Sequence, residues 1–106
     1  MTPISDARAA ALTCAFVHWF GLTNMQARFL VELYARGGEP ISPAALSQAA
    51  ASAPGAVAMN VSLLRRAFDP EAIDYAPGAG YSLTAEGLAE CGRALAHLRA
   101  ELPEAA

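Results

Sequence analysis

The sequence predicts a mainly α-helical domain that contains one small β-hairpin. Apolar residues recur at three- and four-residue spacing through most of the chain, which is the pattern of amphipathic helices. Between about residues 72 and 84 the pattern changes to two short β-type segments around a Pro-Gly turn. The length of 106 residues suits a single domain. We divide it into an N-terminal helix at 5–21, a core at 22–84 and a C-terminal helix at 85–102.

The composition disfavours several classes of protein. Seven cationic side chains, all arginine, stand against ten anionic ones, which gives a net charge of −3. A nonspecific nucleic-acid binder needs a denser basic surface than this. With 55% hydrophobic and 16% charged residues, the chain is also not a disordered tail.

The sequence also gives an expected location. No apolar run reaches the roughly twenty residues of a membrane span, and the N-terminus lacks the pattern of a secretory signal. Two cysteines are too few for a disulfide scaffold. We therefore expect a soluble, reduced, cytoplasmic protein with no membrane partner.

The first predicted helix runs from Ser5 or Asp6 to about Phe20, and Gly21 ends it. Its wide apolar stripe consists of Ala9, Leu12, Phe16, Val17, Trp19 and Phe20. Residues 23–26 match a capping box, so a second helix begins there. The apolar face of this helix consists of Phe29, Leu30, Leu33 and Tyr34, and Gly37-Gly38 supplies a left-handed stop.

Two further helices follow a short extended link at Pro40-Ile41. Ser42 is the expected cap of the third helix and Pro43 its first residue, with an end near Ala51. Its inward residues are expected to be Leu46, Ala49 and Ala50. After a turn at 52–55, a fourth helix is expected from about Ala56 to Phe68, with Val57, Val61, Leu64 and Phe68 on its buried face.

The hairpin is expected to pair 72–75 with 80–84 across the turn at 77–80. Thr84 then caps a final helix, with Glu86 in its first turn. Leu88, Cys91, Leu95, Leu98 and Leu102 form a heptad seam on this helix. Two helices joined by a short turn, followed by a two-stranded ribbon, make a winged helix–turn–helix. Here it has extra N- and C-terminal helices.

From about Leu22 to Leu83 the chain resembles the winged-helix output domain of two-component response regulators. Residues 57–68 resemble the recognition helix of that family, and residues 78–83 resemble its wing. The junction at 81–87 resembles the entry to the dimerisation helix of the multiple-antibiotic-resistance and phenolic-acid regulator families. The resemblance implies a dimeric, sequence-specific DNA-binding transcriptional regulator. No phosphoacceptor domain fits within 106 residues.

The expected partner is therefore double-stranded DNA, with the fourth helix in the major groove and the wing on the adjacent backbone. Helical geometry and the resemblance together give the expected DNA-binding residues: Ser42, Met59, Asn60, Ser62, Leu63, Arg65, Arg66, Gly78 and Tyr81. Arginine can pair with guanine, and methionine or leucine can pack on a thymine methyl group.

A winged-helix module that binds a protein partner without binding DNA is the alternative function. Residues 42–81 carry two arginines against three acidic side chains, a net charge of −1. Exposed Met59 and Leu63 would suit a protein interface.

The outer helices predict a homodimer. A three-helix winged domain nearly fills its own core, so two more strongly apolar helices leave surface for a second copy. The expected dimerisation residues are Leu12, Phe16, Trp19, Phe20, Leu88, Cys91, Leu95, Leu98 and Leu102. Alternatively, both helices cover one monomeric core.

No catalytic arrangement is recognisable in the sequence, since neither histidine has a serine or carboxylate at a telling spacing. We therefore expect no enzyme and no cofactor. Cys14 and His18 have a spacing that can chelate a metal ion, and Cys91 and His97 could add ligands. Because cysteine is ordinarily a buried apolar residue, no metal site is predicted.

Overall fold

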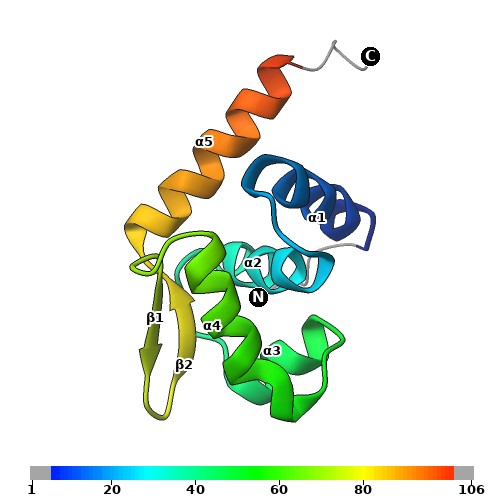
Figure 1. The fold of residues 1–106 in the computed structure, drawn as a ribbon. Coiled ribbons are helices and arrows are strands. Elements are labelled where there is room, and N and C mark those ends of the chain that lie inside the picture. Colours follow the sequence, from blue (N-terminus) through cyan, green and yellow to red (C-terminus); the bar gives the residue numbers. More distant parts are fainter. Residues whose placement is uncertain (1–5, 102–106) are drawn as a thin grey trace.

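The computed structural model describes residues 6–101, with side chains described over 7–98. The described chain is mainly helical with one small antiparallel sheet, as predicted (Figure 1). In order, the elements are α1 (Asp6–Phe20), α2 (Asn24–Ala35), α3 (Pro43–Ala49), a short 3-10 helix (Pro54–Ala56), α4 (Val57–Ala67), β1 (Ile73–Ala76), β2 (Gly80–Leu83) and α5 (Ala85–Glu101). Within 6–101, no helix has the length and apolar character that crossing a membrane requires.

The predicted helix caps are confirmed. At the start of α2, Gln26 N donates to Thr23 Oγ1 at 3.2 Å and Thr23 N donates to Gln26 Oε1 at 3.0 Å, which completes a capping box. Ser42 Oγ accepts from Ala45 N at 3.2 Å before α3, and Thr84 Oγ1 accepts from Gly87 N at 3.1 Å before α5. Local side-chain chemistry therefore sets where three of the helices begin.

The hairpin is joined to the segment that precedes α3. β1 and β2 pair antiparallel, with Ile73 opposite Leu83 and Tyr75 opposite Tyr81. Ile41 N donates to Tyr81 O at 2.8 Å, and Tyr81 N donates to Ile41 O at 2.9 Å. The expected link at Pro40-Ile41 thus forms an isolated β-bridge to β2. The start of α3 is held to the hairpin by these two hydrogen bonds.

Gly80 permits this close approach. Its φ of +120° is rarely adopted by residues with a side chain. A Cβ at this position would lie 2.6 Å from the carbonyl carbon of Ile41 and 2.9 Å from Cα of Ser42. Only glycine fits where the two backbones meet.

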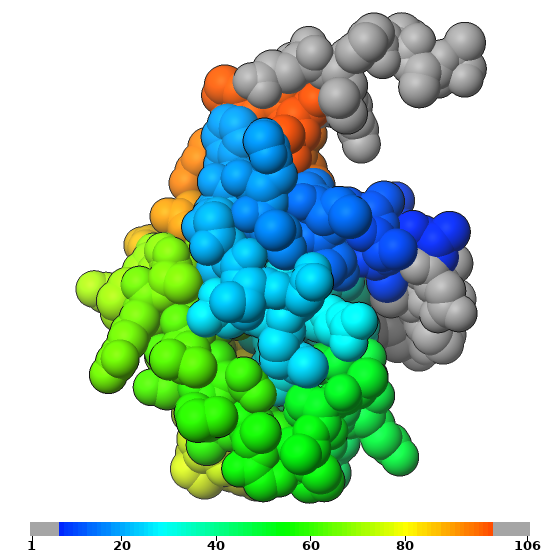
Figure 2. All heavy atoms as spheres, turned by 45° about the vertical axis from the view of Figure 1, so that its right-hand side comes forward, coloured from blue at the N-terminus to red at the C-terminus, as the bar shows by residue number. Residues whose placement is uncertain are grey.

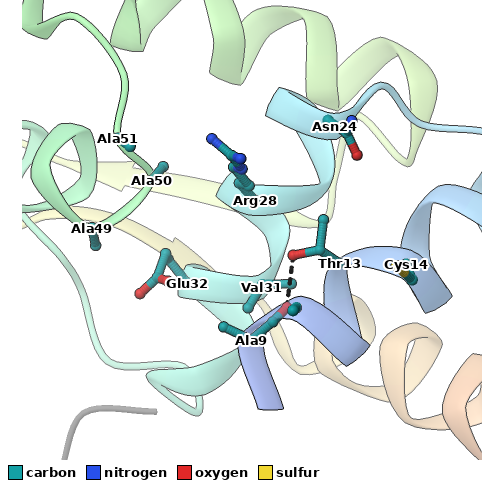
Figure 3. Close-up of a pocket in the computed structure, with 11 residues that line it drawn as sticks. Ala9, Thr13, Cys14, Asn24, Arg28, Val31, Glu32, Ala49, Ala50 and Ala51 are labelled. Atoms are coloured by element: carbon teal, nitrogen blue, oxygen red, sulfur yellow. Dashed lines mark hydrogen bonds between the residues drawn. The ribbon is translucent and has the colours of Figure 1, made fainter. Parts of the chain in front are cut away.

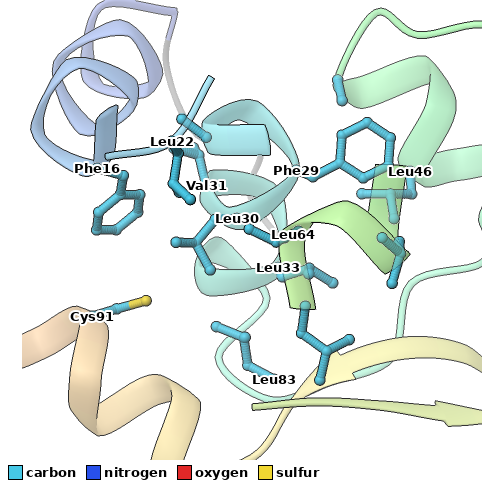
Figure 4. Packing of buried hydrophobic residues seen from close by; sticks show 14 of the residues in the cluster. Phe16, Leu22, Phe29, Leu30, Val31, Leu33, Leu46, Leu64, Leu83 and Cys91 are labelled. Carbon is cyan, nitrogen blue, oxygen red and sulfur yellow. The ribbon is translucent and has the colours of Figure 1, made fainter. Parts of the chain in front are cut away.

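The core is organised around α2. Figure 4 shows Leu30 pointing toward Phe16 of α1 and Cys91 of α5, whereas Phe29 points toward Leu46 of α3. All five of these side chains are fully buried. The buried residues of the four helices around α2 thus form one cluster rather than separate layers.

Two inward positions differ from the prediction. Ala49 is exposed, and Ser47 is buried in its place beside Leu46. Because α3 is only seven residues long and rich in alanine, its sequence does not clearly indicate which face points inward. Phe68 is half-buried rather than buried, and its ring packs edge-on against Phe20 of α1 at 4.6 Å.

Candidate nucleic-acid interface

The outward face of α4 carries four of the nine predicted DNA-binding residues. Val57, Val61 and Leu64 are buried, as the helical pattern predicts. The opposite face exposes Met59, Ser62, Leu63 and Arg66, with 61% of Met59 and 37% of Leu63 accessible. In Figure 2 the green atoms of α3 and α4 lie at the lower surface of the molecule.

The side chains of Asn60 and Arg65 form hydrogen bonds to backbone carbonyl groups of the chain itself. Asn60 Nδ2 donates to Ala56 O at 3.0 Å, which commits the side-chain amide to its own helix. Arg65 Nη2 donates to Ile73 O at 3.0 Å, and the side chain is half-buried. The Arg65 guanidinium thus links α4 to β1, and its predicted contact with DNA stays a prediction. Arg66 remains the exposed cation of α4.

The other predicted interface residues lie on the hairpin and before α3. Gly78 is exposed in the turn. Tyr81 is half-buried, and its ring lies 4.8 Å from that of Tyr75 across the strands. Ser42 is exposed, but its hydroxyl already caps α3. Tyr75, which is 50% exposed, was missed by sequence reasoning. Its pairing with Tyr81 is the signal that could have identified it.

This surface carries little positive charge. Over residues 42–81, Arg66 is the exposed cation, while Glu71 and Asp74 are exposed carboxylates. A binder that neutralises many phosphates would need several exposed cations here. Any DNA contact must therefore depend more on fit in the groove than on charge.

The outer helices α1 and α5 contribute more side chains to the chain's own core than predicted. Leu12, Phe16 and Cys91 are buried inside the monomer, so these three of the expected dimerisation residues offer almost no surface to a second copy in this structure. Burial raises the pKa of the Cys91 thiol to about 12, with a smaller contribution from Glu90. The heptad pattern of α5 indicates that one face of this helix packs against another helix, but it does not show whether that helix belongs to the same chain.

Part of the predicted dimer surface remains accessible. Trp19 is 38% exposed, and its indole stacks on the exposed imidazole of His97 at 5.1 Å, which joins α1 to α5. The half-buried members of the predicted set are Phe20, Leu88, Leu95 and Leu98. Leu102 lies outside the described residues.

The alternative of a metal site gains no support. Cys14 is exposed on α1, whereas Cys91 is buried in the core. In the part of the chain that the structure describes, no three His, Cys, Asp or Glu side chains are grouped to hold a metal ion.

Comparison with known proteins gave no match: no family model, no curated protein and no solved structure is significantly similar to this chain.

Proposed function

We propose that the chain is a winged helix–turn–helix regulator that binds specific DNA sequences as a homodimer. The observation that carries this proposal is the free outward face of α4, which lies beside a hairpin on a rigid support. α2 buries the inner face of α4 through fully buried Leu64, and Arg65 ties α4 to β1. A recognition helix needs this combination of an exposed face and a fixed orientation.

The chemistry of the exposed face suits base edges better than phosphates. Arg66 offers a guanidinium that can pair with guanine, and Ser62 can donate to or accept from a base. Met59 and Leu63 can pack on thymine methyl groups. With so few cations, binding would have a shallow dependence on salt.

A homodimer would compensate for this small contact. Two copies would bring two α4 helices to half-sites about one DNA turn apart, roughly 34 Å. The surface available for this contact includes Trp19 and the half-buried leucines of α5. Sedimentation analysis should give the mass of two chains, and Leu95→Glu should give that of one.

The test is a selection of bound sequences from random DNA, followed by anisotropy titration of the recovered site at several salt concentrations. Arg66→Ala should weaken binding by about 1–3 kcal/mol and relax the preference for the base pair that Arg66 contacts. Arg93→Ala removes an exposed arginine of α5 and should leave both unchanged. Failure to enrich any sequence, or an equal effect of the two variants, would contradict the proposal.

The alternative of a protein-binding module is favoured by one observation. Met59, Leu63 and Tyr75 are large exposed apolar side chains, and they belong to α4 and the hairpin. In this case Leu63→Asp should abolish capture of a protein partner, while the random-DNA selection yields no site.

A further inference from the structure

A cavity of about 430 Å³ lies where α1, α2 and the turn after α3 meet (Figure 3). Its size falls within the range of small-molecule sites. α1 and residues 49–51 contribute mostly alanine methyl groups to its wall, whereas α2 contributes the charged side chains. None of the α4 or hairpin residues discussed above lines it.

The polar side chains form a row along one side of α2. Asn24, Arg28 and Glu32 follow one another at four-residue spacing, so they lie on the same side of the helix and all line the cavity. The rise of the helix separates the Cα atoms of Arg28 and Glu32 by roughly 6 Å along its axis. The cavity is therefore lined by a positive and a negative group from neighbouring turns of α2.

These groups are available to a ligand. Among the lining residues drawn in Figure 3, the hydrogen bond formed is that from Thr13 Oγ1 to Ala9 O, at 2.7 Å. The exposed Arg28 guanidinium is not engaged by any of them and can donate two parallel hydrogen bonds to a carboxylate. The Thr13 oxygen, its proton already donated, can still accept.

Glu32 is half-buried at the same cavity. Desolvation raises the pKa of its carboxyl above the ordinary value, and the opposing effect of Arg36 is smaller. An ammonium group from a ligand would add a second favourable charge to that of Arg36 and offset the desolvation of this carboxylate.

We propose that this cavity binds a short zwitterion, with the ligand carboxylate on Arg28 and its ammonium on Glu32. The alanine wall accommodates an aliphatic chain between the two charged ends. A terminal amino acid with a few methylene groups between its charges can reach both side chains while its aliphatic chain lies along the alanine wall.

Calorimetric titration of the full chain tests this with 4-aminobutyrate, butyrate and butylamine as probes. The zwitterion should bind more tightly than either singly charged analogue. Arg28→Gln and Glu32→Gln should each weaken 4-aminobutyrate binding tenfold or more, since each removes a charge-assisted contact. Glu32→Gln should leave butyrate binding unchanged, whereas Arg28→Gln should abolish it.

Matched controls separate binding from folding. Arg93→Gln and Glu39→Gln change exposed charges that do not line the cavity, and both should bind as the unmodified chain does. Ala10→Leu fills the cavity from an exposed helix position and should abolish binding while the circular dichroism spectrum is retained. No heat with any probe, or equal affinity in the Arg28→Gln and Arg93→Gln variants, would overturn the proposal.

Discussion

Gly80→Ala should be among the most destabilising single substitutions in this chain. The added methyl group would collide with the backbone of Ile41 and Ser42. Neither contact involves the end of a flexible side chain, so the collision can be relieved only by moving the segment before α3 away from the hairpin. The two hydrogen bonds between Ile41 and Tyr81 would then be lost.

The expected loss follows from two contributions. A non-glycine residue at φ +120° costs about 1–3 kcal/mol. Loss of two backbone hydrogen bonds costs about 1 kcal/mol each. The free energy of unfolding should therefore fall by about 3–5 kcal/mol, a large part of the roughly 5–15 kcal/mol of a typical domain.

Urea denaturation followed by circular dichroism measures this loss, and two other glycines provide controls. Gly78→Ala has a positive φ of 85° but open space around its Cβ, so it should show the backbone cost alone. Gly55 has no positive φ and no atom within 4 Å of an added Cβ, so Gly55→Ala should change stability by less than about 1 kcal/mol. If Gly80→Ala is no worse than Gly78→Ala, the contact with Ile41 does not constrain the fold.

Four further predictions concern the core, the two thiols and a helix cap. Phe16→Ala should lower the unfolding free energy by about 3–5 kcal/mol, equally at low and high chain concentration, because this ring fills the monomer core; a concentration-dependent loss would place it at a dimer contact. Iodoacetamide should label exposed Cys14 and spare Cys91 in the folded chain, with both labelled in denaturant. The pKa of the Cys91 thiol is higher in the folded chain than in the unfolded chain. Its contribution to the free energy of unfolding is therefore complete below about pH 9 and is lost as the pH rises toward about 12. Cys91→Ala should make the fall in stability with rising pH less steep. Thr23→Ala should cost about 1 kcal/mol by thermal denaturation, and no change would mean that the capping box is unimportant.

The parts of the fold that depend on near neighbours could be predicted from sequence. The caps at Thr23, Ser42 and Thr84 act on residues three positions away, so the motif and the bond coincide. The buried and exposed faces of α4 also follow from helical spacing alone. Its predicted bounds differ from the observed ones by only one residue at each end.

Contacts between distant residues could not be predicted in this way. Ile41 stands in a two-residue link, and nothing in its neighbourhood indicates a partner at Tyr81. Arg65 resembles an outward arginine until the position of the Ile73 carbonyl is known. The burial of Phe16 and Cys91 within one chain depends on how α1 and α5 pack against α2.

The candidate sites likewise include one part that could be predicted from the sequence and one part that could not. Met59, Ser62 and Arg66 were predicted on the outward face of α4, and they lie there. The cavity was missed because its wall is largely alanine. In sequence, Arg28 and Glu32 resemble any solvated pair on a helix surface.

The stacked contact between Trp19 and His97 also gives the molecule a built-in optical reporter. Trp19 is the single tryptophan of the chain, and it lies where α5 meets α1. Its emission therefore reports on that junction. If the far end of α5 separates from the body, or a second copy covers the half-exposed indole, the wavelength of maximum emission should shift while the helical content is unchanged. Intrinsic fluorescence can thus test the proposed homodimer without any attached dye.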